Sequence, residues 1–224
     1  MIIQSDRIGL DRLGIHNLDN ICYNFSSKEL VTDIVNNGEG IIGMRGAAMV
    51  DTGIYTGRSP KDKYIVNESS SNEKVWWGDV NQKISEKIFD NLFKQIIDFY
   101  NKEKESKTYV FDGHAGADPK YSLNVRIIAK KAWQAHFVRN MFINQDNLIP
   151  EDFDPGFTII NASELKNTEY KKFNMNSETF IIFHLAKKIA IIGGTEYGGE
   201  MKKGIFSVLH LSLIHISEPT RRTI

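Results

Sequence analysis

Two adjacent lysines, Lys202 and Lys203, follow a glycine-broken loop that carries Tyr197. An apolar run at 189–192 leads into this loop, and a helix is expected to begin at Gly198 or just after it. Ammonium groups near the free backbone N–H groups of a helix start form a field that suits an anion. The stretch therefore predicts an anion or metal site, and the alternative is a solvated pair of surface lysines.

A second cationic position, Arg58, lies in a loop directly before Ser59-Pro60. Serine followed by proline, with Asp62 three residues after the serine, is typical of a helix start with an N-cap, a proline at the first helical position and a capping-box-like carboxylate. The planar guanidinium of Arg58 suits a carboxylate or a phosphate. We therefore predict an oxyanion-binding role, and the alternative is a surface arginine in a tight turn.

Two histidines and a pair of tryptophans are the next residues that could take part in catalysis or ligand binding. His114 has no partner at metal-ligand spacing, and His184 lies in an apolar run. We interpret both histidines as structural rather than catalytic. Adjacent Trp76 and Trp77 favour packing in the core or between elements over stacking on a ligand.

The composition excludes several classes of protein. Lysine plus arginine and aspartate plus glutamate each total 28, so the net charge of zero predicts neither nucleic acid nor an anionic membrane as a general partner. The single cysteine, Cys22, cannot form an internal disulfide, and the first residues lack the apolar region of a secretory signal. No run approaches the roughly 18 to 20 apolar residues of a membrane span. We expect a cytoplasmic protein.

The elements that must position these residues alternate along the chain. With 224 residues, 41% of them hydrophobic, the chain has room for one generous domain or two small ones. Helices are expected after Ser26, over 84–99 and over 130–142; short strands are expected at 41–44, 46–50, 108–112, 123–128, 157–162, 179–185 and 189–192, with a loop at 113–120. This alternation predicts an α/β fold, with three layers and a mixed β-sheet.

Six motifs give the chain a family resemblance. They are distributed over nearly the whole chain up to His210, in the same order as in the family that they resemble. The first and the last motif are the most specific. The motifs are TGRSPKDKYIV (56–66), VWWGDVNQKIS (75–85), GADPKY (116–121), WQAHFVRNMFI (133–143), SETF (177–180) and GGTEYGGEMKKGIFS (193–207). In these motifs the chain resembles the ATP-dependent phosphoenolpyruvate carboxykinases.

The resemblance implies conversion of oxaloacetate and ATP to phosphoenolpyruvate, ADP and CO2, the gluconeogenic direction. It also implies Mg²⁺ on the nucleotide and a second divalent ion, typically Mn²⁺. Matched by position, Arg58 is similar to the arginine that binds the substrate carboxylate and the CO2 region, and Tyr197 to the substrate-site tyrosine. Lys202 and Lys203 match a catalytic pair, of which the second, Lys203, contacts substrate and coordinates Mn²⁺.

The chemistry of these residues agrees with the reaction. Decarboxylation of oxaloacetate leaves an enolate, whose negative charge needs fixed cations before the γ-phosphoryl group captures it. Arg58, Lys202 and the metal ion would supply them. Lysine binds a metal only as the neutral amine, and the charge of Lys202, the divalent ion and the helix start all favour that form of Lys203.

Other parts of the family's machinery are not found in this sequence. No Gly-Lys-Ser or Gly-Lys-Thr of a phosphate loop occurs, and neither do the histidine and aspartate that complete the Mn²⁺ shell in the resembling family. We therefore expect residues 1–210 to form the amino-terminal, substrate-binding domain of such an enzyme, separate from its carboxy-terminal ATP-binding domain. On its own the chain is predicted to be inactive.

The last residues, 211–224, depart from the family pattern. Residues 211–221 are similar to the translation of a sequencing-library adapter, so we expect 211–224 to be a non-native tail in which His215 has no function. The nucleotide sequence tests this expectation. The rival hypothesis for the whole chain is a stand-alone module that binds dicarboxylates or phosphates through Arg58 and the lysine pair without catalysis.

Overall fold

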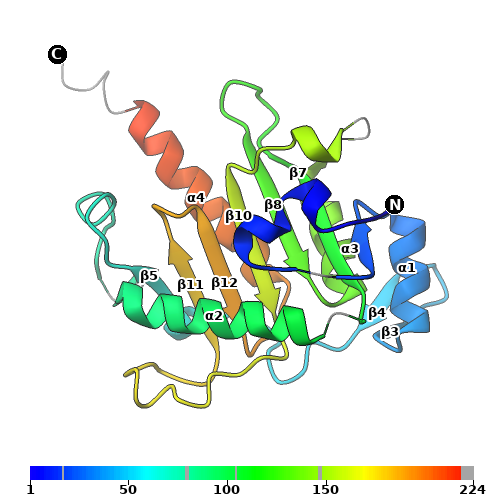
Figure 1. The fold of residues 1–224 in the computed structure, drawn as a ribbon, viewed down its shortest axis with the longest axis horizontal. Helices are drawn as coiled ribbons and strands as arrows, with labels where there is room; N and C mark the ends of the chain where they lie inside the picture. Colours follow the sequence, from blue (N-terminus) through cyan, green and yellow to red (C-terminus); the bar gives the residue numbers. More distant parts are fainter. Residues whose placement is uncertain (17, 79–80, 104, 146–147, 218–224) are drawn as a thin grey trace.

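The computed structural model describes residues 1–16, 18–78, 81–103, 105–145 and 148–217, with the backbone alone for 212–217 (Figure 1). Its helices are α1 (Ser27–Asn36), α2 (Glu86–Lys102), α3 (Ala132–Met141) and α4 (Gly199–Ser217). Its strands are β1 (Ile2–Ile3), β2 (Ile21–Tyr23), β3 (Gly40–Ile42), β4 (Ala48–Val50), β5 (Lys63–Val66), β6 (Gln82–Ile84), β7 (Thr108–Ala115), β8 (Leu123–Ala129), β9 (Ile143–Asn144), β10 (Phe157–Ala162), β11 (Phe180–His184) and β12 (Ile189–Gly193).

Within these described residues, a ten-stranded mixed sheet forms the centre of the fold. Its order is β1-β2-β7-β8-β10-β12-β11-β5-β6, with β9 paired to β7, while β3 and β4 form a separate hairpin. Strands β10, β11 and β12 are buried over nearly their whole length, which explains why most of their residues are apolar. The predicted α/β class and mixed sheet are confirmed.

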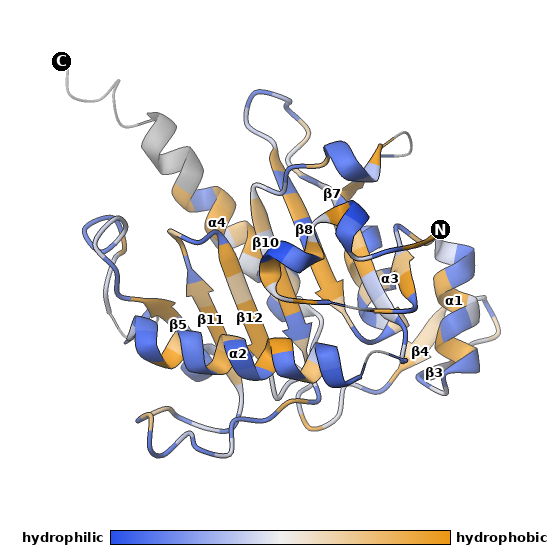
Figure 2. Cartoon of the chain, viewed as in Figure 1, coloured by the Kyte–Doolittle hydropathy of each residue, from blue (hydrophilic) through white to orange (hydrophobic). Residues whose placement is uncertain are grey.

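Helices cover both faces of the sheet, which gives the three expected layers. Helix α2 lies across one face in Figure 1, and its buried residues Phe89, Leu92, Ile96 and Tyr100 recur at helical spacing. Helices α3 and α4 lie against the other face, where Val138, Met201 and Ile205 join a second core cluster. Figure 2 shows the resulting pattern, with hydrophobic strands between amphipathic helices.

Strand directions decide where the predicted site residues lie. Strands β8, β10 and β12 are parallel, whereas β11 is antiparallel to β12 and parallel to β5. Gly193 at the end of β12 pairs with Phe180 at the start of β11, and the next residue of β11, Ile181, pairs with Lys63 at the start of β5. The loop after β12 and the loop before β5 therefore meet at one edge of the sheet.

Local predictions differ from the structure at several positions. The expected loop at 113–120 begins later, because β7 continues to Ala115 by pairing with β8 and β9. The packing interpretation is wrong for Trp76, whose side chain is 72% exposed, while Trp77 packs against the second core cluster. The predicted helix at 84–99 starts at Glu86, since Ile84 belongs to β6 and Ser85 is the N-cap.

The helix α4 continues through residues 211–217 without a break, so the first half of the predicted tail is helical. Residues 218–224 of that tail lie outside the described residues. Across the part of the chain that the structure describes, no helix combines the length and apolar character that crossing a membrane requires.

Candidate active site

The glycine-broken loop connects β12 to α4 and presents the lysine pair. Gly194 has a φ of 73°, and a Cβ there would lie 2.9 Å from the Cα of Thr179, so both conformation and space require glycine. Helix α4 begins at Gly199, and Lys202 and Lys203 are exposed on its first turn and a half. The Nζ of Lys203 lies 4.8 Å from the centre of the Phe206 ring.

The turn that carries Arg58 is held by a buried carboxylate. Asp62 is 2% exposed and accepts hydrogen bonds from Asn176 Nδ2 at 2.8 Å, from Ser177 Oγ at 2.8 Å and from Ser59 Oγ. The predicted short helix is confirmed as a 3-10 turn over Pro60–Asp62, with Ser59 at the N-cap position and Pro60 at the first helical position. Its capping differs from the prediction, because the hydroxyl of Ser59 donates to Asp62 instead of accepting a backbone N–H.

Thr179 at the start of β11 joins the two loops. Its hydroxyl donates to the backbone oxygen of Gly194 at 2.9 Å and accepts a hydrogen bond from the Tyr55 hydroxyl at 2.8 Å. A single hydroxyl thus connects the loop before Arg58 to the loop before α4. Arg58 itself is exposed at the surface of this connection.

Glu200 makes the most direct link between the two predicted halves of the site. Its side chain lies in the first turn of α4, is 7% exposed, and accepts the backbone N–H of Ser59 at 2.7 Å. Burial raises the pKa of Glu200, while the hydrogen bond from Ser59 and the positive charges of Arg58 and Lys63 oppose this shift. The structure therefore brings the Arg58 turn to the beginning of α4.

Sequence reasoning missed Glu200 and Lys63. The available signal for Glu200 was an acidic residue in the first turn of a helix, just before the two lysines. Lys63 is half-buried, with its Nζ 5.7 Å from the centre of the Phe183 ring. Burial lowers the pKa of Lys63, as does the charge of Arg58, and Glu200 opposes both. A fourth basic group thus belongs to the region of Arg58 and the lysine pair.

Tyr197 lies on another side of the α4 start. Its side chain lines a cavity of about 350 Å³ between α1, β4 and α3, together with Trp133 and Phe137. The neighbouring Glu196 forms an ion pair with Lys131 at 3.0 Å, which ties this loop to the beginning of α3. Among the described residues, no hydrogen bond joins the side chain of Tyr197 to Arg58 or to the lysine pair.

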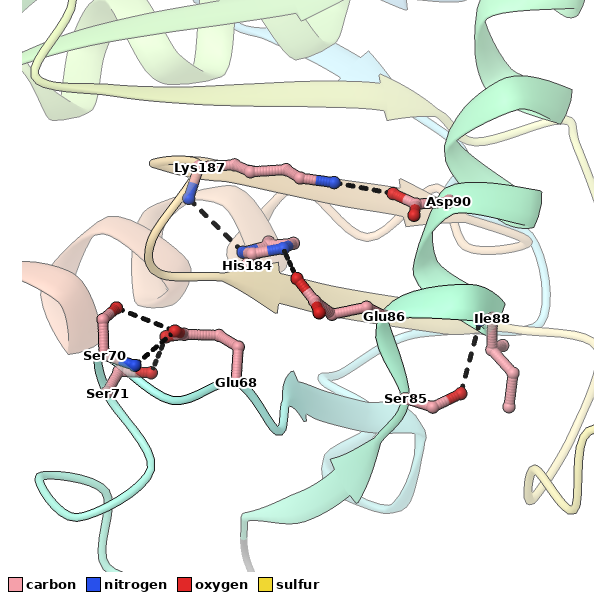
Figure 3. Close-up of polar contacts among 9 residues, drawn as sticks. All are labelled: Glu68, Ser70, Ser71, Ser85, Glu86, Ile88, Asp90, His184 and Lys187. Carbon is pink, nitrogen blue, oxygen red and sulfur yellow. Dashed lines mark hydrogen bonds and ion pairs between the residues drawn. The ribbon is translucent and has the colours of Figure 1, made fainter.

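The structural interpretation of His184 is confirmed. Figure 3 shows its ring between α2 and the β11–β12 turn: Nδ1 accepts the Lys187 N–H at 3.3 Å, so Nε2 carries the proton and donates to Glu86 at 3.2 Å. Burial lowers the pKa of His184, and nearby Lys187 adds to the shift. His184 is the last residue of β11 and pairs with Ile189, so it lies at the other end of the strands from Gly193. His114 contacts Gln145 at 3.1 Å through Nδ1.

The described residues do not form a complete metal site. No group of three or more His, Cys, Asp or Glu side chains suitable for a metal occurs among them. One carboxylate oxygen of Glu200, the nearest acidic residue in sequence to the lysine pair, accepts the N–H of Ser59. Within this part of the molecule, Lys203 offers a single nitrogen donor.

Comparison with known proteins adds an independent finding. Residues 19–217 match the family described as phosphoenolpyruvate carboxykinase. The chain is similar to the phosphoenolpyruvate carboxykinase (ATP) of Leptospira biflexa, with 50% identity over 213 residues that cover 95% of this chain and 39% of the relative. The corresponding proteins of Campylobacter lari and Sulfurimonas denitrificans are 45% and 42% identical, each over 90% of this chain and 38% of their own length. The chain thus spans about two fifths of the length of the curated relatives that it matches.

Proposed function

The chain belongs to the phosphoenolpyruvate carboxykinase family, and from this we propose that it forms part of an enzyme that converts oxaloacetate and ATP to phosphoenolpyruvate, ADP and CO2. The proposed direction is gluconeogenic. The observation that carries the proposal is the hydrogen bond between Ser59 and Glu200, because it joins the Arg58 turn to the helix that bears Lys202 and Lys203. Cations from distant parts of the chain thereby share one edge of the sheet.

Each site residue has a proposed role in this reaction. Arg58 binds the carboxylate of oxaloacetate, for which its planar guanidinium is suited. Lys202 provides a fixed positive charge for the enolate that decarboxylation leaves. Tyr197 is proposed to contact the substrate beside the start of α4.

The proposed cofactors are inferred from membership of the family. A divalent ion, proposed to be Mn²⁺, would supply electrostatic stabilisation of the enolate, and Mg²⁺ would accompany ATP. Lys203 would hold the Mn²⁺ as a neutral amine. The remaining ligands and the phosphate-binding loop are proposed to come from the part of the enzyme that corresponds to the other three fifths of its relatives. Residues 1–210 are the proposed substrate-binding domain.

A stand-alone module that binds dicarboxylates without catalysis is not favoured. The relatives that contain this segment at 42–50% identity are all named phosphoenolpyruvate carboxykinase (ATP). We propose a cytoplasmic location, which rests on Cys22 being a buried free thiol. Small molecules are the proposed partners, with no role for nucleic acid or a membrane.

A chimera tests the proposal. In this Leptospira chimera, the chain replaces the matching 213 residues of the Leptospira biflexa relative. We expect ATP-dependent release of CO2 from oxaloacetate by the chimera in a coupled assay, and no turnover by the 224-residue chain alone. A folded chimera that binds ATP but releases no CO2 would contradict the proposed function. Turnover by the chain alone would contradict its proposed dependence on a further domain.

A further inference from the structure

A cavity separate from the Arg58 region lies where three helices approach one another. Its volume is about 440 Å³, and it is bounded by the ends of α1 and α2 and by the junction between β8 and α3. Charged and polar side chains contribute most of its wall. They include Glu39, Ser106, Lys107, Lys130, Lys131 and Glu164.

Most of these charged side chains already pair with an opposite charge or with the backbone N–H groups at the start of a helix. Lys107 forms an ion pair with Asp33 at 2.6 Å, and Lys131 forms one with Glu196 at 3.0 Å. The two carboxylate oxygens of Glu39 accept the first N–H groups of α3, from residues 132 and 133, at 3.0 Å and 2.9 Å. These contacts hold the wall of the cavity in place, because each joins different elements.

Lys130 differs from its neighbours in its partners. Its Nζ donates to the backbone oxygen of Glu103 at 2.7 Å and to the hydroxyl of Ser106 at 2.9 Å, and lies 5.2 Å from the centre of the Tyr100 ring. Among the described residues, Lys130 forms no ion pair within 4.0 Å. Two uncharged acceptors satisfy both N–H groups of a neutral amine and leave its lone pair free. A charged ammonium in the same place lacks a carboxylate partner.

The electrostatics of the cavity agree with this geometry. Burial lowers the pKa of Lys130 to about 8, although the negative charges of Glu103 and Glu164 act in the opposite direction. At pH 7.5 a lysine with that pKa is roughly one quarter unprotonated, compared with about one thousandth for an ordinary exposed lysine. Lys130 therefore combines a lowered pKa and uncharged hydrogen-bond acceptors with open space beside its amine.

We propose that Lys130 is a site of acylation by small activated acyl donors, with the acyl group accommodated in the adjoining cavity. The neutral Nζ attacks the carbonyl carbon of an acyl phosphate, a C–N bond forms, and the C–O bond to phosphate breaks. Phosphate leaves with the electron pair, and the amine releases one proton to water. The product amide keeps one N–H, so one of the two contacts to Glu103 and Ser106 is lost. This inference does not rest on the proposed carboxykinase activity.

Site-resolved labelling of the 224-residue chain with acetyl phosphate tests the proposal. Mass spectrometry of the peptides gives an initial acetylation rate for each lysine. At pH 7.5 we expect Lys130 to react at least about fivefold faster than the exposed Lys28 and Lys87, a smaller factor than the difference in unprotonated fraction because a less basic amine attacks more slowly. This preference should decline as the pH rises toward 10, where ordinary lysines also lose their protons.

Four controls separate the effects of the fold and of nearby charge from that of the local sequence. In urea-unfolded chain the preference for Lys130 should disappear, and in Lys130→Arg the labelled position should be lost while circular dichroism stays unchanged. Glu164→Gln should increase the rate at Lys130, because it removes a negative charge that favours the ammonium. The matched variant Glu169→Gln, whose carboxylate pairs with Lys172, should leave the rate unchanged. Equal rates at Lys130, Lys28 and Lys87 in the folded chain, or a preference that persists in urea, would overturn the proposal.

Discussion

Arg58 shows how an exposed side chain can still have a defined position. Its guanidinium is at the surface, but the next residue, Ser59, is held by Glu200 through its N–H and by Asp62 through its hydroxyl. The backbone of Arg58 is therefore fixed relative to α4 and β11, while its charged group remains available to a ligand. Because the backbone of Arg58 is already ordered, binding of an anion to its guanidinium costs little backbone conformational entropy.

Substitution Arg58→Lys in the Leptospira chimera should strongly reduce catalysis. Lysine keeps the charge but loses the two-pronged hydrogen bonding that a carboxylate accepts from arginine. We expect kcat/KM for oxaloacetate to fall about 100-fold, roughly 2.7 kcal/mol of transition-state stabilisation. Arg45→Lys, in the exposed turn between β3 and β4, is the matched control and should have little effect. Equal losses in both variants would argue against a specific role for Arg58.

Glu200 should be a source of instability at neutral pH. Burial raises its pKa, so the folded state favours the protonated acid, and stability is lost as the pH rises from the unfolded-state pKa through the raised folded-state pKa. Glu200→Gln keeps an acceptor for the Ser59 N–H without the charge. We expect the free energy of unfolding in urea to increase at pH 7, with the difference vanishing once the pH falls below the ordinary pKa of a glutamate.

The control for this prediction is Glu73→Gln, an exposed position at which stability should not change at either pH. A destabilised Glu200→Gln at pH 7 would show that the ionised carboxylate is a net contributor through Arg58 and Lys63. The sign of the change thus decides between burial and charge pairing as the dominant effect at Glu200.

At the scale of elements, long periodic segments could be predicted from the sequence and short ones could not. Helix α2 has an apolar residue every three or four positions, and β10 and β12 are mostly apolar runs of six and five residues. Strands β2 and β6 have three residues each, too few to show a period. The signals at Ser59 and Pro60 do predict a short helix, and it ends after one turn because Lys63 already pairs with Ile181 of β11.

The candidate site shows the same division. Arg58 and the lysine pair could be identified because charge next to glycine or proline is visible in the sequence. The role of Asp62 could not, since its three donors come from its own turn and from residues 176–177, which only the pairing of β5 with β11 brings close. The hydrogen bond between Glu200 and Ser59 could not be predicted for the same reason, since it depends on β11 lying between β12 and β5.

Loss of the Asp62 carboxylate should destabilise the turn that carries Arg58. Asp62→Ala leaves the Asn176 amide and two serine hydroxyls without their buried acceptor. We expect the free energy of unfolding in urea to fall by about 2 to 4 kcal/mol. Lys61→Ala changes an exposed side chain of the same turn and should stay within about 0.5 kcal/mol of the parent chain. If Asp62→Ala also lowered the free energy of unfolding by no more than about 0.5 kcal/mol, water would be shown to replace the carboxylate as the acceptor.

At the scale of the whole molecule, large apolar side chains remain exposed around the β3–β4 hairpin. Ile41 and Met49 are cross-strand partners and are 66% and 57% exposed, and Met44 in the turn between them is fully exposed. Nearby in sequence, Ile54 is 87% exposed. Exposed apolar side chains grouped in this way are typical of an interface. The chain spans about two fifths of its relatives' length.

The isolated chain should therefore associate with itself through this hairpin. In sedimentation equilibrium we expect the average mass to rise above 25.5 kDa with concentration. The double variant Ile41→Lys with Met49→Glu should suppress the increase, because it replaces apolar contact by charge while the opposite charges across the strand pair preserve the hairpin. Ile149→Lys, at an exposed apolar residue far from the hairpin in sequence, should associate like the parent chain. A double variant that still associates would assign the contact to another surface, whereas a parent chain that stays monomeric throughout would show that the exposed hairpin is tolerated in water.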